Sequence, residues 1–442
     1  MSDQLRPRSN GSKNLSTIAR HGRLKRSSAF ATIAKFLAAG LAVVMVSGVS
    51  VAAIATFDVA NSAQPGVVLD NVEGVPEVPQ IDAIEGGVNV LVVGSDSRVG
   101  QDAVFGDSDS TGTLNDVTML LHISEDHKNA SVISFPRDMF VPIPSCTGPD
   151  GDSYSAMSRQ KINTTLTYGG LACTVLTVEK LTGLDIPYAA EVQFSGVMAM
   201  STAVGGVPVC VAEDIEDVQS DTFLAAGEHT LEGYEALQFL RTRHGVGDGS
   251  DLTRINNQQL FMSSLVRQIK SSETLSDWTK VYSLAKAVTS NMSLSTSLNN
   301  VDTIVSIALA LKDIDLDKVV FAQTPTGNTD GGVLPSQPAF KDMFTALAND
   351  EAIELSGSTG GGTVVDPNAP ITAEPEATEA PAPEAPVTEA APTDEATTDP
   401  SAGPTDAATD DPDDGVTTLS ESVTGQTAGD YTCTAGRSLQ DQ

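Results

Sequence analysis

The 442-residue chain is strongly acidic, with 25 Lys and Arg against 58 Asp and Glu and a formal net charge of −33. This balance makes binding of nucleic acid by the whole chain electrostatically unfavourable. The charge is also unevenly placed, because residues 1–35 hold eight basic residues and one acidic residue, a net charge of +7. A basic N-terminal arm therefore precedes an acidic body that carries the remaining −40.

The segment after the arm predicts a single membrane span. Residues 36–57 contain no charged residue, and 22 residues suffice to cross roughly 30 Å of hydrocarbon as a helix. The positive-inside rule keeps the arm (1–35) cytoplasmic, so everything after Asp58 is expected to be extracytoplasmic. The alternative is a cleaved signal peptide, since Ala53-Ile54-Ala55 resembles a cleavage site. The apolar run is longer than a usual signal core, which favours the uncleaved anchor.

Beyond the membrane span, a proline-containing spacer at residues 58–87 leads into a folded domain at residues 88–350. Short, nearly continuous apolar runs in this domain predict strands buried on both faces, and periodic segments predict helices. The predicted strands are Val88–Val93, Val117–Ile123, Ala130–Phe135, Gly206–Val211 and Lys318–Ala322. The predicted helices are Thr174–Leu181, Phe194–Ala203, Leu231–Leu240, Asp251–Lys270, Trp278–Val288 and Val301–Leu311. This interleaving predicts one α/β domain with helices on both faces of a central sheet.

The composition changes after the folded domain. Residues 356–419 are rich in Pro, Ala, Thr and acidic residues, and no Lys or Arg occurs between Lys341 and Arg437. Such a segment buries too little apolar surface to offset its chain entropy, so a disordered acidic tail is expected. The last segment, residues 420–442, regains β-prone character and can dock back onto the domain through Cys433.

All four cysteines fall on the predicted outer side of the membrane, where disulfides are stable. Four cysteines allow three pairings. Cys146 and Cys173 flank one motif-rich stretch and form the preferred pair, which leaves Cys210 for Cys433. No C-x-x-C spacing occurs, so zinc or thioredoxin-like chemistry has no support.

Arginine is scarce between Asp58 and Leu355, so its placement is informative. Five arginines sit in short polar blocks at the ends of predicted strands or helices: Arg98, Arg137, Arg241, Arg243 and Arg254. A guanidinium fork suits phosphate oxygens, and several that converge predict a pyrophosphate site. The alternative is a set of surface ion pairs, which are common and weak.

Two acids could meet beside these arginines. Asp96 directly follows the first predicted strand and Asp116 directly precedes the second. Loops at the ends of adjacent strands face one crevice, where two carboxylates could share a magnesium ion. The alternative is that each acid caps a turn or a helix.

A predicted helix adds further polar groups. Asp251, Arg254 and Gln258 lie three and four residues apart, on one helical face. Asp251 could instead serve as an N-terminal cap. Arg241 and Arg243 share a side only where the chain is extended. The sequence has no G-x-S-x-G, H-E-x-x-H or G-x-x-x-x-G-K-[ST] motif, and these chemistries are therefore excluded.

Seven blocks in order resemble the signature of the LytR-CpsA-Psr family, with details similar to actinobacterial members. They are VLVVGSDSR (90–98), NDVTMLLHI (115–123), VISFPRD (132–138), KINTTLTYGG (161–170), GGVPV (205–209), LEGYEALQFLRTRHGVGDGSDLTR (231–254) and NQQ (257–259). The resemblance covers residues 88–270 directly. It implies a mixed sheet in an αβα sandwich, with a hydrophobic groove for a polyprenyl chain and a polar mouth for its pyrophosphate.

The resemblance also implies an activity: transfer of a glycan 1-phosphate from a polyprenyl pyrophosphate to a hydroxyl of peptidoglycan. Arabinogalactan, teichoic acid and capsule all remain possible glycans. Asp96 and Asp116 are the implied ligands for Mg²⁺, with Mn²⁺ as the alternative ion. Arg98, Arg137, Arg241, Arg243 and Arg254 are the implied phosphate ligands, with Lys161, Asp251 and Gln258 in support. Asp96 is the first candidate for a general base.

The chain departs from the family pattern at two positions. Leu114 and Asn257 stand where family members often have Arg, so two phosphate contacts are missing or replaced. Phosphoryl transfer needs mostly positioning and charge neutralisation, which the remaining arginines and a divalent ion supply. Two other functions stay open: a non-catalytic envelope regulator that binds lipid-linked glycan, and a pyrophosphatase that uses water as the acceptor.

Overall fold

The computed structural model describes residues 64–69, 83–98, 101, 113–271, 278–366 and 415–442. The basic arm, the predicted membrane span at residues 36–57, much of the spacer and residues 367–414 of the predicted tail lie outside the described residues. Among the helices that are described, none is long and apolar enough to cross a membrane.

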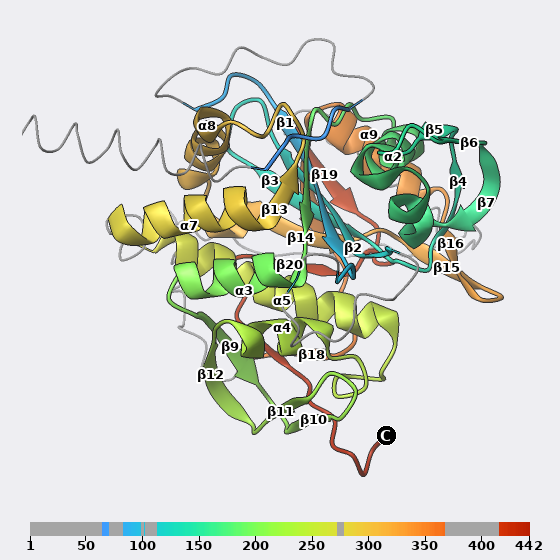
Figure 1. Cartoon of the computed structure of the whole chain (residues 1–442). Helices are drawn as coiled ribbons and strands as arrows, with labels where there is room; N and C mark the ends of the chain where they lie inside the picture. The colour runs from blue at the N-terminus through green and yellow to red at the C-terminus, as the bar shows by residue number, and fades with distance from the viewer. Residues whose placement is uncertain (1–63, 70–82, 99–100, 102–112, 272–277, 367–414) are drawn as a thin grey trace, which may run out of the picture. The chain divides into compact units, whose positions relative to one another are not determined.

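A mixed seven-stranded sheet forms the centre of the domain (Figure 1). Its order is β13 (Met292–Leu294), β8 (Tyr188–Val192), β1 (Val88–Ser95), β2 (Asn115–Ile123), β3 (Ala130–Phe135), β14 (Val319–Gln323) and β20 (Gly425–Thr427). Strand β1 is parallel to β8, and β3 is parallel to β14. The other neighbours are antiparallel.

Alternate residues of the central strands enter two separate hydrophobic cores. Leu91 and Leu120 pack on one face with helix α2 (Thr165–Thr182) and helix α9 (Ala339–Ala348). Val90 and Met119 pack on the other face, toward helix α8 (Val301–Lys312) and part of helix α5 (Asp251–Lys270). Because both faces are covered, the sequences of these strands are nearly continuous apolar runs. The predicted α/β arrangement with helices on both faces is therefore confirmed.

Several helices begin and end near the predicted residues. Helix α3 (Phe194–Ala203) and α5 have the predicted bounds, and α7 spans Trp278–Asn291. Helix α5 begins sharply because Oγ of Ser250 accepts a hydrogen bond from the backbone N–H of Thr253.

Two predicted helices were wrong in extent. Helix α2 begins at Thr165 rather than Thr174, and non-helical backbone at Gly169 and Gly170 interrupts its apolar period. Helix α4 is Tyr234–Arg241 rather than Leu231–Leu240, because Leu231 ends strand β12 (Gly227–Leu231).

The C-terminal part of the chain belongs to the same fold, which corrects the predicted domain end at Asp350. Strand β17 (Ala352–Leu355) pairs with β19 (Val416–Leu419). Strand β20 completes an edge of the central sheet, and a four-stranded sheet has the order β12, β9 (Val207–Val211), β21 (Thr432–Thr434), β18 (Thr363–Val365). Strands β18 and β19 lie inside the segment 356–419 that was predicted to be disordered throughout. These strands are three or four residues long and gain their partners from distant segments, so local composition does not reveal them.

Disulfides join the cysteines in the preferred pairing. Cys146 is bonded to Cys173, which ties β5 (Cys146–Thr147) to α2. Cys210 is bonded to Cys433, which ties β9 to β21. Smaller two-stranded pairs complete the described fold: β4 (Phe140–Ile143) with β7 (Met157–Lys161), β5 with β6 (Ser153–Tyr154), β10 (Ile215–Asp217) with β11 (Thr222–Leu224), and β15 (Thr326–Thr329) with β16 (Gly332–Pro335).

Candidate active site

The two predicted metal-site acids lie at the same end of the central sheet. Ser95 ends β1 and is paired with Asn115, which begins β2, and the N–H of Asp96 donates to the carbonyl of Leu114 at 3.1 Å. Asp116, the residue after Asn115, is near enough for its charge to act on Asp96. Asp116 lies within β2 rather than before it. The Oδ1 atom of Asp96 accepts a 2.7 Å hydrogen bond from the backbone N–H of Leu114. Burial raises the pKa of Asp96, and the nearby charge of Asp116 raises it further, although the Leu114 hydrogen bond opposes both.

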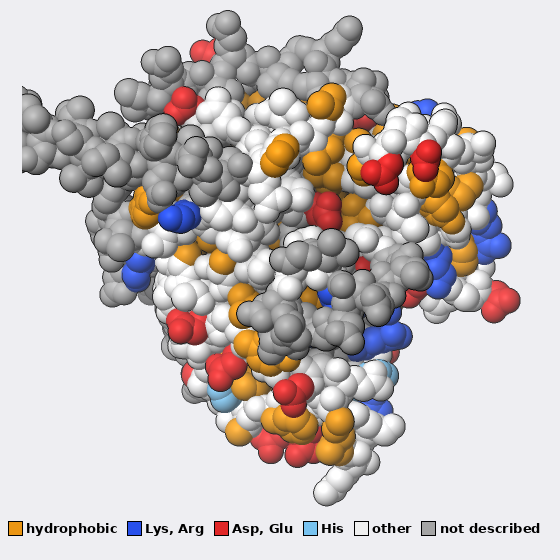
Figure 2. All heavy atoms as spheres, in the orientation of Figure 1, with side chains coloured by type: hydrophobic (Ala, Val, Ile, Leu, Met, Phe, Trp, Pro, Cys, Tyr) orange, Lys and Arg blue, Asp and Glu red, His pale blue; other side chains and the backbone are white. Residues whose placement is uncertain are grey.

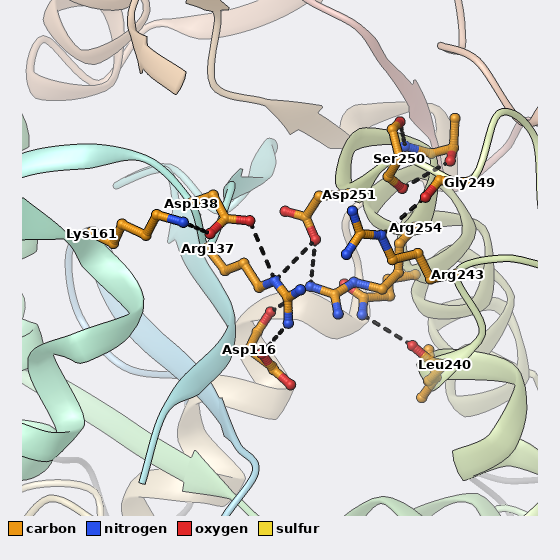
Figure 3. A network of polar contacts seen from close by, with 12 residues as sticks. Asp116, Arg137, Asp138, Lys161, Leu240, Arg243, Gly249, Ser250, Asp251 and Arg254 are labelled. Carbon is orange, nitrogen blue, oxygen red and sulfur yellow. Dashed lines mark hydrogen bonds and ion pairs between the residues drawn. The ribbon is translucent and has the colours of Figure 1, made fainter. Parts of the chain in front are cut away.

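Arg137 follows β3 and joins Asp116 to the start of helix α5 (Figure 3). Its Nη1 atom donates a 2.7 Å hydrogen bond to Oδ1 of Asp116, and its Nε atom lies 3.5 Å from Oδ1 of Asp251. Burial alone lowers the pKa of Arg137, but the hydrogen bond and charge of Asp116 outweigh it and leave the pKa above its ordinary value. The guanidinium group is therefore permanently charged and fixed in orientation.

Arg254 reaches the same point from helix α5. Its Nη2 atom lies 2.6 Å from Oδ1 of Asp251 and donates to the backbone carbonyl of Asp116 at 3.2 Å. Arg254 is only 6% exposed, and its buried Nε atom has no hydrogen-bond partner among the described residues. Burial lowers the pKa of Arg254, and the charge of Arg137 acts in the same direction. Two guanidinium groups this close repel each other, so binding of an anion between them is favourable.

The end of helix α4 and the loop after it supply two further arginines. The guanidinium carbon of Arg241 lies 4.9 Å from the ring centre of Phe194. Arg243 donates from Nε to the carbonyl of Gly249 at 3.0 Å. Figure 3 shows Arg243 and Arg254 approaching from the helical side, opposite Arg137 on the sheet side. The chain leaves the helix at Thr242, whose backbone is extended, and Arg241 and Arg243 on either side of it both line the cavity.

Asp217 organises this loop and was missed by the sequence analysis. Its Oδ2 atom accepts hydrogen bonds from Oγ1 of Thr242 at 2.8 Å and from the backbone N–H groups of Arg243 and His244 at 3.0 and 3.1 Å. Its Oδ1 atom accepts from the N–H of Gln219 at 2.9 Å. Burial by itself raises the pKa of Asp217, but these hydrogen bonds outweigh burial and lower the pKa to about 2. Asp217 lies in an acidic stretch of an acidic chain, so no sequence signal sets it apart.

A cavity of about 370 Å³ opens among these groups. Its polar side is lined by Asp116, Arg137, Asp217, Arg241, Arg243, His244, Arg254 and Gln258. Its apolar side is lined by Val92, Val117, Met119, Val192, Phe194, Val197, Met200, Leu237, Leu240, Phe261, Met262 and Leu265. The cavity thus lies between the sheet, helix α3 and helices α4 and α5. Along helix α5 the lining passes from Arg254 and Gln258 to Phe261, Met262 and Leu265, so the end near the start of α5 suits an anion and the remainder suits a hydrocarbon chain.

Other predicted residues lie at or beyond the rim. Gln258 lines the cavity and donates to the carbonyl of Leu240 at 3.1 Å. Lys161 does not line it; its Nζ atom lies 2.6 Å from Oδ1 of Asp138. Arg98 also lies outside the lining, but it is near enough to Asp96 for its charge to oppose the rise in that pKa. Figure 2 shows Lys and Arg side chains along the right-hand side of this face, toward β4 and β7.

Asn257, which stands where family members often have Arg, has a structural role. It is fully buried and does not line the cavity. Its Nδ2 atom donates to the carbonyl of Phe239 at 2.9 Å, and its Oδ1 atom accepts from Oγ1 of Thr434 at 2.7 Å. Asn257 therefore joins α4, α5 and the C-terminal strand β21 rather than replacing a phosphate ligand.

The donor set at Asp96 and Asp116 fits a hard divalent cation. The charge of Asp116 raises the pKa of Asp96, which shows that the two carboxylates repel each other. A cation between them would remove this repulsion. Magnesium in proteins is often bound by one or two carboxylates, with water and substrate phosphates completing the shell. In the described part of the chain, the group of three or more metal-ligand side chains that lie together is Cys210, Asp366 and Cys433, and its two sulfurs are bonded to each other in a disulfide.

The fold and the site define an α/β domain with a cavity that is lined both by arginines and by apolar side chains. The model of the LytR_cpsA_psr family matches residues 58–349. The chain therefore belongs to the LytR-CpsA-Psr family.

The chain is also similar to individual proteins. The sequence is 29% identical to Cell wall biosynthesis protein LcpA of Corynebacterium glutamicum over 65% of this chain and 58% of that protein. It is 26% identical to Polyisoprenyl-teichoic acid--peptidoglycan teichoic acid transferase TagT of Bacillus subtilis, over 55% and 70% of the two chains. A solved LytR-Csp2A-Psr enzyme from Actinomyces oris aligns with a TM-score of 0.47 at 20% identity, covering 64% of this chain and 96% of that one. The chain thus spans a little over half the length of the corynebacterial relative.

Proposed function

We propose that this protein is a phosphotransferase that moves a glycan 1-phosphate from a polyprenyl pyrophosphate carrier to a hydroxyl of peptidoglycan. We further propose that one N-terminal helix anchors it in the cell membrane, with the catalytic domain on the outer side. The names of two relatives, a cell wall biosynthesis protein and a teichoic acid transferase, support the first proposal. The uncharged run at residues 36–57 supports the second.

The observation that carries the proposal is the division of one cavity into an apolar side and an arginine-lined side. Arg137, Arg241, Arg243 and Arg254 line the polar side. A polyprenyl pyrophosphate has the same division, with a hydrocarbon tail and a doubly anionic head. A regulator that only binds the lipid needs the same shape, but it has no need for paired acids beside the phosphate site.

The proposed reaction replaces one bond at phosphorus with another. The acceptor oxygen forms a bond to the phosphorus that carries the sugar, and the bond from that phosphorus to the bridging oxygen breaks. Polyprenyl phosphate leaves with the bridging oxygen, and the glycan is joined to the wall through a phosphodiester. The proton of the acceptor hydroxyl goes to a base, for which Asp96 is the candidate because burial raises its pKa.

The arginines bind and orient the pyrophosphate. Arg137 and Arg254 are held on either side of the Asp251 carboxylate, so their remaining N–H groups are positioned before the substrate arrives. Charge that develops on the leaving phosphate is then neutralised without reorganisation of the site. A magnesium ion, with manganese as the alternative, bound by Asp96 and Asp116 would neutralise further phosphate charge. Arg98 and Lys161 are proposed to contact phosphate groups from the rim.

A transfer assay with a matched pair of arginine variants tests the proposal. The purified full-length chain is incubated with lipid-linked glycan, Mg²⁺ and peptidoglycan. We expect Arg254→Ala to reduce attachment at least about 100-fold, since a buried cation at the phosphates is lost. Arg159→Ala is the control, because Arg159 is exposed and stacks on Phe140 outside the cavity. Equal attachment by both variants contradicts the proposal, and release of polyprenyl phosphate without acceptor favours a pyrophosphatase.

A further inference from the structure

A second groove lies away from the arginine cavity. Two adjoining hollows of about 560 and 320 Å³ share Tyr431 and Thr432 in their lining. Helix α5 separates this C-terminal groove from the cavity: Gln258 and Met262 line the cavity, whereas Ser264 and Arg267 line the groove. The larger hollow lies at the start of β3 and β14, and Arg137 follows the other end of β3. The groove is therefore independent of the transfer site.

An aromatic ring lies where the two hollows meet. Tyr431 is 37% exposed, and the guanidinium carbon of Arg267 lies 4.6 Å from its ring centre. Arg267 is itself held, because Nη1 donates to the carbonyls of Ala428 and Asp430 at 2.7 and 3.0 Å and to Oγ of Ser263 at 2.8 Å. The ring is thus fixed on one side and accessible on another. A fixed tyrosine of this kind offers an apolar face together with a polar edge.

The larger hollow also contains an unused hydrogen-bond donor. Gln426 is 3% exposed and lines the hollow; its Oε1 atom accepts a 2.8 Å hydrogen bond from Oγ1 of Thr432. The Nε2 atom of Gln426 has no partner among the described residues. A buried donor without a partner costs about 1–3 kcal/mol, so an incoming oxygen that accepts from it is favoured.

The charge of the groove decides which ligands suit it. Five carboxylates line it against two cations: Asp317, Glu354, Asp430, Glu228 and Asp366 against Lys318 and Arg267. This excess repels phosphate-bearing polymers. Carboxylates and amides around a fixed aromatic ring instead suit a ligand with many hydroxyl groups, which donate to the carboxylates while a ring face packs on the tyrosine.

From these observations we infer that the C-terminal groove binds an uncharged polysaccharide, with one sugar packed on Tyr431 and its neighbours in the two hollows. The inference does not rest on the proposed transfer reaction, because the groove shares no lining residue with the arginine cavity. If both hold, the groove keeps a glycan strand near the transfer site and raises its effective concentration there.

Direct binding to defined polymers tests the inference without any lipid substrate. The full-length chain in detergent is titrated with chitohexaose, with a neutral arabinogalactan, and with poly(glycerol phosphate). We expect both uncharged glycans to bind and the phosphate polymer to bind at least about tenfold more weakly. Tyr431→Ala is expected to weaken glycan binding about tenfold, whereas Tyr431→Phe keeps the ring and the affinity. Gln426→Met, which keeps the shape and removes the donor, is expected to weaken binding about fivefold.

The control is Phe223→Ala, which removes an exposed ring, 55% exposed, that does not line the groove. It should bind the glycans as the unmodified chain does. The inference is overturned if neither uncharged glycan binds, if Tyr431→Ala binds as tightly as the unmodified chain, or if poly(glycerol phosphate) is the preferred ligand. A loss of binding in Tyr431→Phe equal to that in Tyr431→Ala also overturns the role given to the ring.

Discussion

Arg137, just after strand β3, donates a 2.7 Å hydrogen bond to Asp116 in the neighbouring strand β2. The bond joins a candidate metal ligand to a candidate phosphate ligand. Arg137 also faces Asp251 at 3.5 Å, so its planar group is held between two acids from separate elements. Only a guanidinium group can make both contacts and still present N–H groups to a phosphate.

Transfer should depend on the forked shape of the Arg137 side chain as well as on its charge. In Arg137→Lys the charge remains but the fork is lost, so one ammonium group cannot reach Asp116, Asp251 and the phosphate together. We expect the initial rate of transfer to fall about 100-fold in Arg137→Lys and further in Arg137→Ala. Initial rates with saturating acceptor measure this. A rate in Arg137→Lys within threefold of the unmodified protein means that charge alone matters.

Asp217 gives a prediction about positioning. In Asp217→Asn an amide NH₂ group replaces one carboxylate oxygen. The backbone N–H or hydroxyl groups that donate to that oxygen then lose their acceptor. The turn that carries Arg243 should shift, and transfer should fall about tenfold or more, mainly through a higher KM for the lipid-linked substrate. Steady-state kinetics separate KM from kcat. An unchanged KM with a normal kcat assigns Asp217 to stability alone.

Asp217 also predicts how stability depends on pH. Its pKa is about 2 in the folded state, against an ordinary value of 3.8. The folded state therefore holds this proton less tightly, so the stabilisation is fully present above about pH 4 and is lost as the pH falls toward 2. A shift of this size is about 2 kcal/mol. The difference in unfolding free energy between the unmodified chain and Asp217→Asn should shrink by that order between pH 6 and pH 2.5, measured by urea unfolding. A constant difference contradicts it.

The two disulfides should contribute unequally. Cys210–Cys433 closes a separation of 223 residues, and Cys146–Cys173 closes one of 27 residues. The chain-entropy model gives about 5 kcal/mol for the longer loop and about 3.5 kcal/mol for the shorter. We expect Cys210→Ser with Cys433→Ser to lower Tm more than Cys146→Ser with Cys173→Ser. Thermal unfolding of the two double variants compares them, and the reverse order is the contrary result.

Transfer should depend on Mg²⁺ through the proposed ligands Asp96 and Asp116. Asp96→Asn removes one of the two proposed ligands and also the candidate base, so the maximal rate should fall as well, while the amide oxygen can still accept from the N–H of Leu114. The concentration of Mg²⁺ needed for half-maximal transfer should rise at least about tenfold, and EDTA should abolish transfer by the unmodified chain. Magnesium titrations with both proteins measure this. Activity that survives complete chelation removes the ion from the proposal.

The predictable parts of the fold are those set by local pattern. Strand β3 and helices α3 and α5 have the predicted bounds, because apolar periodicity and the Ser250 cap are local features. Strand β12 was not predicted, apart from Leu231, which was assigned to the following helix; its polar residues show no strand alternation, and it pairs with β9. The C-terminal strands depend on partners up to 223 residues away, as at Cys210 and Cys433, which local composition cannot show.

The site could be predicted in part for a similar reason. Arginines are rare in this acidic chain, so Arg137, Arg243 and Arg254 were conspicuous, and all three line one cavity. Asp217 was hidden among many acids and acts through backbone hydrogen bonds, which leave no sequence pattern. The burial of Asn257 likewise depends on Thr434, a contact between distant segments.

The fate of the phosphorus atom tests the transfer reaction most directly. Lipid-linked glycan labelled at the phosphorus next to the sugar is incubated with the full-length chain, Mg²⁺ and peptidoglycan, and label on the wall is compared with polyprenyl phosphate released. We predict one labelled phosphate on the wall for each polyprenyl phosphate released, and neither product with Arg137→Ala. Labelled glycan phosphate released into solution with an unlabelled wall, or wall attachment without polyprenyl phosphate, would contradict phosphotransfer.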